Sequence, residues 1–131
     1  MKPTILIVDD EPGVRSSLSG VLRDEGYVVE AVSTGEACLD RVSRSPVDLI
    51  VLDVWMPGMD GLEVTRKIRA RRDAKSMVPI VVITADTGST IQQDCQDAGA
   101  QDLLLKPVAM QPLLDTICLQ VLSSNPDMEM I

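Results

Sequence analysis

Residues 49–61 have the sequence LIVLDVWMPGMDG, in which four aliphatic residues run directly into Asp53 and a loop rich in glycine and proline follows. Three other short apolar runs also end at polar residues: 5–8 at Asp9 and Asp10, 80–83 at Thr84, and 103–105 at Lys106. Such continuous aliphatic runs are typical of parallel strands that are buried on both faces. Because parallel strands end at a common edge, where ligands bind, we expect these polar side chains to lie together.

Helical patterns separate the apolar runs. Pro12 is tolerated at the start of a helix, and apolar residues then recur at helical spacing until Gly26. The other expected elements are a strand over 28–32, helices over 35–43, 62–72 and 89–98, and a last helix around 113–121. This alternation of strand and helix predicts a doubly wound α/β sandwich with helices on both faces of the sheet.

Composition narrows the classes of function. The chain has 131 residues, enough for one domain, and its net charge of -8 disfavours binding to nucleic acid or to an anionic membrane. The basic residues between 66 and 75 are interpreted as the solvated face and end of a helix. No apolar stretch has the length of a membrane span or of a signal-peptide core.

The cysteine and histidine content excludes several kinds of site. Three well-separated cysteines without a CxxC pair suggest neither a disulfide framework nor a zinc site, so a reducing, cytoplasmic location is expected. The sequence contains no histidine, which excludes Ser-His-Asp and Cys-His nucleophile systems and any phosphohistidine on this chain. A phosphohistidine donor would have to be another molecule.

The polar strand ends suit phosphoryl transfer. Two unit charges ~4 Å apart cost about 4 kcal/mol at an effective dielectric of ~20, so clustered carboxylates need a cation, and Mg²⁺ fits such a site. Asp10 and Asp53 are the expected direct ligands, with Asp9 acting through water. Asp53 is the candidate nucleophile, because a carboxylate can form an acyl phosphate, and Thr84 and Lys106 are expected to contact phosphoryl oxygens.

Several of these stretches resemble the receiver domain of bacterial two-component response regulators. They are residues 7–12 (IVDDEP), 52–61 (LDVWMPGMDG), 82–85 (VITA), 99–100 (GA) and 106–107 (KP). The resemblance covers about residues 4–122. It implies a flavodoxin-like fold, with a five-stranded parallel sheet in the order 2-1-3-4-5 and five helices. Residues 1–122 would be the receiver domain and 123–131 a C-terminal tail or linker stub.

The resemblance also implies roles for individual residues. Asp53 would accept a phosphoryl group from a sensor histidine kinase or a histidine phosphotransfer protein, and the backbone carbonyl of Trp55 would join the Mg²⁺ ligands. Thr84 would move toward the phosphoryl group and Lys106 would pair with it. The bond between Lys106 and Pro107 would be a cis peptide, which only X-Pro bonds adopt at low cost. Such a switch would at most dephosphorylate itself slowly, and it is not an enzyme in the usual sense.

Three positions are expected to tune this behaviour. Receivers often carry Tyr or Phe where this chain has Leu103, so an aromatic switch is in doubt and signalling is expected to use the loop and helix over 87–98. Trp55 and Asp86 lie two residues after Asp53 and Thr84, where receivers tune hydrolysis of the acyl phosphate. The expected fourth and fifth helices lack basic residues, which argues against a salt-bridged dimer.

Other classes of function remain open on the sequence. An aspartyl-nucleophile phosphohydrolase would want an acid where Trp55 stands, and a substrate-binding cap for which the chain has no length. A flavin or nucleotide binder of similar topology would need a phosphate loop, but neither GxGxxG nor GxxxxGK[ST] occurs. A phosphorylation-independent interaction module is a further alternative. The cognate kinase, the effector and any additional domain are not specified by these residues.

Overall fold

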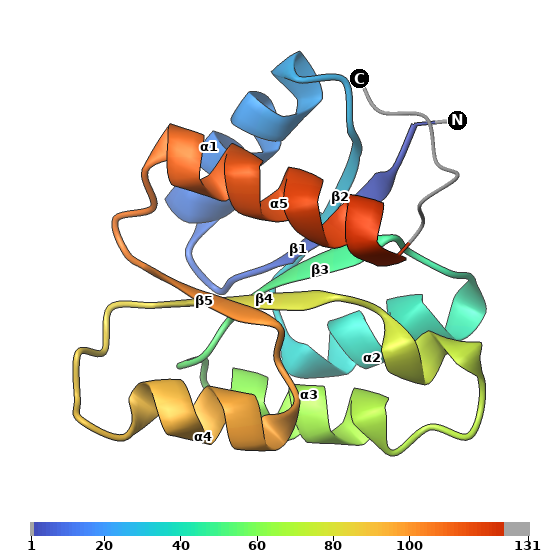
Figure 1. The fold of residues 1–131 in the computed structure, drawn as a ribbon, viewed down its shortest axis with the longest axis vertical. Coiled ribbons are helices and arrows are strands. Elements are labelled where there is room, and N and C mark those ends of the chain that lie inside the picture. The colour runs from blue at the N-terminus through green and yellow to red at the C-terminus, as the bar shows by residue number, and fades with distance from the viewer. Residues whose placement is uncertain (1, 125–131) are drawn as a thin grey trace.

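Five strands and five α-helices alternate along residues 2–124, the part of the chain that a computed structural model describes (Figure 1). The strands are β1 (Thr4–Val8), β2 (Val28–Val32), β3 (Leu49–Asp53), β4 (Ile80–Thr84) and β5 (Asp102–Leu105). The helices are α1 (Pro12–Asp24), α2 (Gly35–Arg44), α3 (Gly61–Arg69), α4 (Ile91–Ala98) and α5 (Met110–Ser124), with a short 3-10 helix η1 (Ala74–Met77) before β4. No helix within the described residues is long and apolar enough to cross a membrane.

The strands form one parallel sheet in the order β2-β1-β3-β4-β5, which confirms the predicted topology. Val8 lies beside Leu52 in the register, and Asp53 lies beside Ile83. Thr84 lies beside Leu105. The four strands that end at or just before the predicted site residues therefore have their carboxyl ends at one edge of the sheet.

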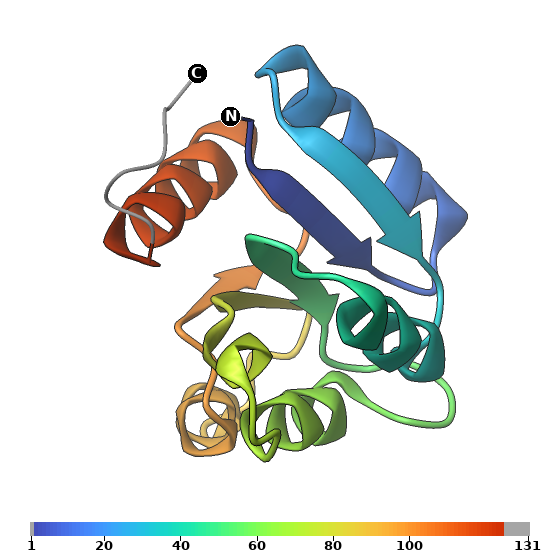
Figure 2. The same cartoon turned by 90° about the vertical axis from the view of Figure 1, so that its right-hand side faces the viewer.

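Both faces of the sheet are covered by helices, as expected for aliphatic strands that have no polar face. Figure 1 shows α1 and α5 on one face and α2, α3 and α4 on the other, and the turned view in Figure 2 agrees. Side chains alternate accordingly: Ile50 and Leu52 of β3 pack into the α2–α3–α4 core, and Leu49 and Val51 pack into the α1–α5 core. The two cores hold the sheet edge in a fixed position.

Two helices are shorter than their sequence patterns predicted. The third helix ends at Arg69 and not at residue 72, because the Arg71 side chain pairs with Asp73 and the chain turns into η1. The fourth begins at Ile91 and not at 89, because Gly88 donates its backbone N–H to the Asp86 side chain and stays in the preceding loop. At the other end of the chain, α5 reaches Ser124, and residues 125–131 of the expected tail lie outside the described residues.

Gly61 allows α3 to begin directly against the end of β3. Its backbone N–H donates to the Val54 carbonyl at 2.7 Å. A Cβ atom built at position 61 would overlap the Asp53 carbonyl oxygen and lie 2.9 Å from the Val54 Cα. Since both neighbours are backbone atoms, they cannot move without shifting the loop that follows Asp53. Glycine is therefore required at this position by close packing.

We expect Gly61→Ala to lower the free energy of unfolding by about 1–3 kcal/mol, the usual cost of overpacking. Gly20→Ala is the matched control, because position 20 lies inside α1 with open space around it. That substitution should raise the free energy of unfolding by about 0.5–1 kcal/mol through helix propensity. Urea denaturation measures both changes, and equal stability of Gly61→Ala and the unmodified protein would contradict the packing argument.

Candidate functional site

Three carboxylates meet at the carboxyl edge of the sheet. Asp9 and Asp10 follow β1 and Asp53 ends β3, and these neighbouring strands bring one oxygen from each side chain within 4.8 Å of the others. Asp9 is fully buried and Asp53 is only 4% exposed, whereas Asp10 is open to solvent. The acidic cluster predicted from separate strand ends is therefore present as one site.

Lys106 supplies a positive charge to this cluster. Its Nζ lies 2.9 Å from Asp9 Oδ2, 3.4 Å from Asp53 Oδ2 and 3.2 Å from Glu11 Oε1. Burial by itself lowers the pKa of Lys106, but its contacts with these carboxylates outweigh burial and raise the pKa above its ordinary value. Lys106 is therefore a fixed cation at the site.

The donor set fits a hard divalent cation such as Mg²⁺. Asp9 Oδ2 is buried and accepts no hydrogen bond, although Lys106 Nζ lies 2.9 Å from it as an ion-pair partner. Asp10 leaves one side of the cluster open to water. Three oxygen donors around an open position match the preference of Mg²⁺ for few carboxylates and several waters. The three carboxylates also exceed the charge that Lys106 alone can balance.

The environment of Asp53 makes its charged form unfavourable. Burial raises the pKa of Asp53 to about 6, and the neighbouring Asp9 carboxylate adds to this effect. Lys106 acts in the opposite direction but does not cancel the rise. A metal ion placed among the three carboxylates would favour the ionised form of Asp53, which is the form that can act as a nucleophile.

Thr84 ends β4 next to this cluster. Its side chain is fully buried, and its Oγ1 accepts the backbone N–H of Asp86 at 3.0 Å. The Thr84 carbonyl accepts the backbone N–H of Lys106 at 2.8 Å, so the β4 and β5 ends are tied together. The peptide bond between Lys106 and Pro107 is cis.

The three positions expected to tune the site differ in their surroundings. Trp55 is about half exposed, and its indole Nε1 donates to Asp86 Oδ2 at 3.0 Å. Leu103 of β5 is partly buried against the core on the α2–α3–α4 side of the sheet. Trp55 and Asp86 thus contact each other in the loops at the carboxyl edge of the sheet, whereas the Leu103 side chain packs against the hydrophobic core.

The sequence reasoning missed two residues that support the cluster. Glu11 contacts Lys106 through its side chain, and its backbone N–H donates to Asp9 Oδ1 at 2.9 Å. Arg15 donates from its guanidinium to the Asp9 carbonyl at 2.7 Å. The position of Glu11 directly after two aspartates was the only available signal. Arg15, one turn into α1, had no signal in the sequence pattern.

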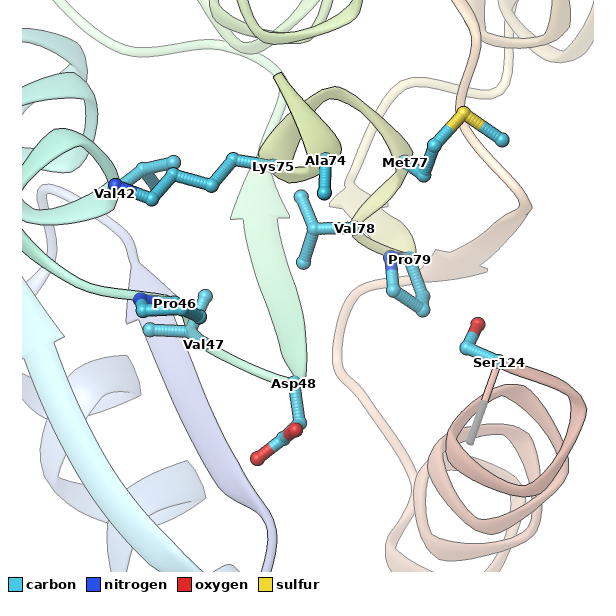
Figure 3. Close-up of a pocket in the computed structure, with 10 residues that line it drawn as sticks. All are labelled: Val42, Pro46, Val47, Asp48, Ala74, Lys75, Met77, Val78, Pro79 and Ser124. Carbon is cyan, nitrogen blue, oxygen red and sulfur yellow. The ribbon is translucent and has the colours of Figure 1, made fainter. Parts of the chain in front are cut away.

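Two cavities lie on different sides of the molecule. One of about 440 Å³ adjoins the site, and Glu11 and Lys106 are among its lining residues, together with Gly13, Val14, Ser17, Leu18, Ala85, Pro107 and Val108. The other, of about 360 Å³, lies near the starts of β3 and β4 and is lined mainly by apolar side chains, among them Val47, Met77 and Pro79 (Figure 3). Among the described residues that line it, Asp48 is the only carboxylate, and it accepts the Thr4 backbone N–H. The described lining of this second cavity therefore offers no comparable cluster of charged groups.

Comparison with known proteins identifies a family. The sequence-family model that describes the response regulator receiver domain matches residues 5–118 of this chain. The protein named response regulator MprA from Mycobacterium sp. (strain KMS) is 40% identical over 127 residues, which cover 97% of this chain and 54% of that protein. MprA from Mycobacterium leprae is 42% identical over 94% of this chain and 53% of its own length. The chain thus spans about half the length of these curated relatives.

Solved structures agree with the sequence comparison. The chemotaxis response regulator CheY4 of Vibrio cholerae has a TM-score of 0.84 and 30% identity, covering 92% of this chain and 99% of that one. The receiver domain of the sensor histidine kinase PA1611 from Pseudomonas aeruginosa also has a TM-score of 0.84 and 30% identity, over 92% and 98% of the two chains. In that structure a magnesium ion is coordinated in the active site cleft.

The raised pKa of Asp53 predicts a pH-dependent cost to stability. Between about pH 4 and pH 6 the folded protein holds a proton on Asp53 that the unfolded chain has released. The contribution of Asp53 to the free energy of unfolding is therefore fully present below pH 4 and is lost as the pH rises to 6. In the presence of a chelator, we expect the free energy of unfolding of Asp53→Asn, taken relative to that of the unmodified protein, to rise by about 2 kcal/mol from pH 4 to pH 7. Denaturant titrations at each pH measure this difference.

Asp97→Asn is the matched control, because Asp97 is an exposed aspartate on α4 outside the acidic cluster. Its stability should follow that of the unmodified protein at every pH. A constant difference between Asp53→Asn and the unmodified protein from pH 4 to pH 7 would contradict the assignment of the titration to Asp53.

Proposed function

Because the chain belongs to the response regulator receiver domain family, we propose that it is a signalling switch that accepts a phosphoryl group on Asp53. Receiver domains are switches and not classical enzymes. The observation that carries the proposal is the position of the Asp53 carboxylate, which lies 3.4 Å from Lys106 and within the cluster formed with Asp9 and Asp10. The proposed nucleophile, Asp53, thus lies beside Lys106, which would neutralise negative charge during the transfer.

The proposed step is the attack of an Asp53 carboxylate oxygen on the phosphorus atom of a phosphohistidine in another protein. A P–O bond forms on Asp53 while the P–N bond to the imidazole breaks, and the leaving imidazole takes up a proton. Such transfers depend mainly on positioning and on neutralising the charge of the phosphoryl oxygens. Lys106 is already held beside the nucleophile, and Thr84 ends the adjacent strand.

Mg²⁺ is the proposed cofactor, and when bound it would neutralise charge between Asp53 and the phosphoryl group. Asp10, Asp53 and the backbone carbonyl of Trp55 are the proposed direct ligands, with Asp9 acting through water. Two features support this assignment: the clustering of the three carboxylates, and the buried Asp9 Oδ2, which accepts no hydrogen bond although it forms an ion pair with Lys106. Magnesium in the cleft of the related PA1611 receiver domain is consistent with it.

The proposed partners are a sensor histidine kinase or a histidine phosphotransfer protein that supplies the phosphoryl group, and an effector that responds to the changed surface. The chain spans only about half of its curated relatives, so the effector is assigned to no particular domain or protein. The net charge of -8 supports a receiver that does not itself bind nucleic acid or membranes. A cytoplasmic location and slow self-dephosphorylation belong to the same proposal, as does a receiver domain over residues 1–122 with a tail beyond it.

The direct test is intact-mass measurement after incubation with Mg²⁺ and acetyl phosphate. We expect the unmodified protein to gain the mass of one phosphoryl group, because Asp53 is the nucleophile and the metal supplies the missing positive charge. Asp53→Ala should gain nothing, and neither should the unmodified protein in excess chelator. Asp97→Ala, which removes an aspartate of α4, should be phosphorylated normally. Failure to gain mass with acetyl phosphate and with a phosphohistidine protein donor would favour a phosphorylation-independent interaction module.

Metal binding is tested separately through stability. Mg²⁺ bound only by the folded protein should raise the unfolding free energy, by about 2.7 kcal/mol at one hundred times its dissociation constant. We expect Asp10→Asn to lose most of this gain, because it removes the exposed carboxylate of the cluster, whereas Asp97→Asn should keep it. Denaturant titrations with and without Mg²⁺ measure the effect. Equal Mg²⁺ stabilisation of all three proteins would contradict the proposed ligands.

A further inference from the structure

A hydrogen bond joins the loop after β3 to the loop after β4, at the carboxyl edge of the sheet where Asp53 lies. The indole Nε1 of Trp55, in the loop after β3, donates to Asp86 Oδ2, in the loop after β4, at 3.0 Å. The two residues are 31 positions apart in the sequence, so the contact exists only because β3 and β4 are neighbours in the sheet. Its acceptor is a carboxylate, and hydrogen bonds to charged groups are stronger than those between neutral groups.

Asp86 connects this contact to the Thr84 hydroxyl. Its backbone N–H donates to Thr84 Oγ1 at 3.0 Å, and its second carboxylate oxygen accepts the Gly88 N–H at 2.7 Å. One residue therefore binds the tryptophan of the phosphoacceptor loop, the buried threonine, and the loop that leads into α4. These three hydrogen bonds form a continuous path from the end of β3 to the start of α4.

The path has a consequence for any movement of Thr84. In the observed arrangement Thr84 Oγ1 is held by the Asp86 N–H, so a rotation of the side chain toward a phosphoryl group on Asp53 breaks that bond or draws Asp86 with it. A displacement of Asp86 in turn strains or breaks its bond to Trp55. Leu103, packed into the core, has no polar group that can take part in such coupling.

We propose that the hydrogen bond between Trp55 and Asp86 is a latch that holds Thr84 in its unphosphorylated position and opens when Asp53 is phosphorylated. This inference rests on the proposed phosphoacceptor function of Asp53. The side chains of Trp55 and Asp86 are positioning groups in this scheme, since both act on Thr84 and not on the phosphoryl group, and Trp55→Phe leaves the backbone carbonyl proposed as a Mg²⁺ ligand in place. Opening of the latch releases the loop over 85–90 and changes the surroundings of the indole at the protein surface.

The fluorescence of the unlabelled protein reports on the latch, because Trp55 is the only tryptophan in the sequence. Beryllium fluoride with Mg²⁺, used as a mimic of the phosphoryl group, should change the emission of Trp55 in the full chain, whereas Mg²⁺ alone should change it less. In Asp86→Ala the latch is absent from the start, so emission should respond little to the mimic. An unchanged Trp55 spectrum in protein that has bound the mimic would overturn the proposal.

A double-mutant cycle isolates the hydrogen bond from the loss of the Asp86 charge. Trp55→Phe removes the donor and keeps an aromatic ring, so it should tighten binding of beryllium fluoride about tenfold, the lower end of the range for a hydrogen bond to a charged group, since this contact is exposed. In the Asp86→Ala background the same substitution should have no further effect. Asp97→Ala, which removes one negative charge from α4, should bind the mimic with unchanged affinity. Calorimetric titration measures all of these affinities without using the fluorescence of Trp55.

The outcomes separate this proposal from the one on which it rests. Phosphorylation of Asp53 together with unchanged affinity in Trp55→Phe, or with fully additive effects in the double variant, would overturn the latch and leave the phosphoacceptor function intact. Failure of the unmodified protein to take up a phosphoryl group or bind the mimic would overturn both.

Discussion

The structure depends on holding several carboxylates close to one lysine at an edge that water reaches only partly. Asp9 is buried, Asp53 is nearly so, and Lys106 lies within 3.4 Å of both. Burial of Asp53, together with repulsion from Asp9 and Asp10, opposes its ionisation in the folded protein, and the raised pKa of Asp53 expresses this cost. The same repulsion favours binding of a divalent cation. The metal-free folded state is therefore less stable than it would be without this repulsion, and binding of a cation would recover that stability.

The rest of the fold keeps this unfavourable cluster in place. β1 and β3 lie side by side between two aliphatic cores, so the strand ends that carry the carboxylates cannot move apart without exposing buried side chains. Gly61 brings α3 directly against the backbone at Asp53, and the backbone bond from Lys106 to Thr84 fixes the β5 end. The repulsion is therefore balanced by packing throughout the domain, and not by contacts of the site alone.

The elements with strong local signals were predictable, whereas contacts between loops were not. The strand end at Asp53 follows from an aliphatic run, and the clustering of strand ends follows from parallel topology, so the family resemblance and the sheet order were both confirmed. The end of α3 at Arg69 was missed, because the contact of Arg71 with Asp73 and the turn into η1 leave no trace in the apolar periodicity. The bond between Trp55 and Asp86 likewise depends on two side-chain conformations in separate loops, which no periodicity encodes.

Charge balance explains why the loops, and not the sheet, are suited to respond at this site. The three carboxylates and Lys106 together carry two negative charges, which one Mg²⁺ would neutralise. The proposed phosphoryl group on Asp53 would replace a single negative charge with about two at pH 7, so one negative charge would again lack compensation. No second lysine or arginine side chain among the described residues forms an ion pair with the cluster, and the Thr84 hydroxyl at the end of the adjacent strand is a further donor. Because Thr84 already accepts the Asp86 backbone N–H, the proposed phosphorylation would reorganise the loop that begins there if Thr84 turned toward the new charge.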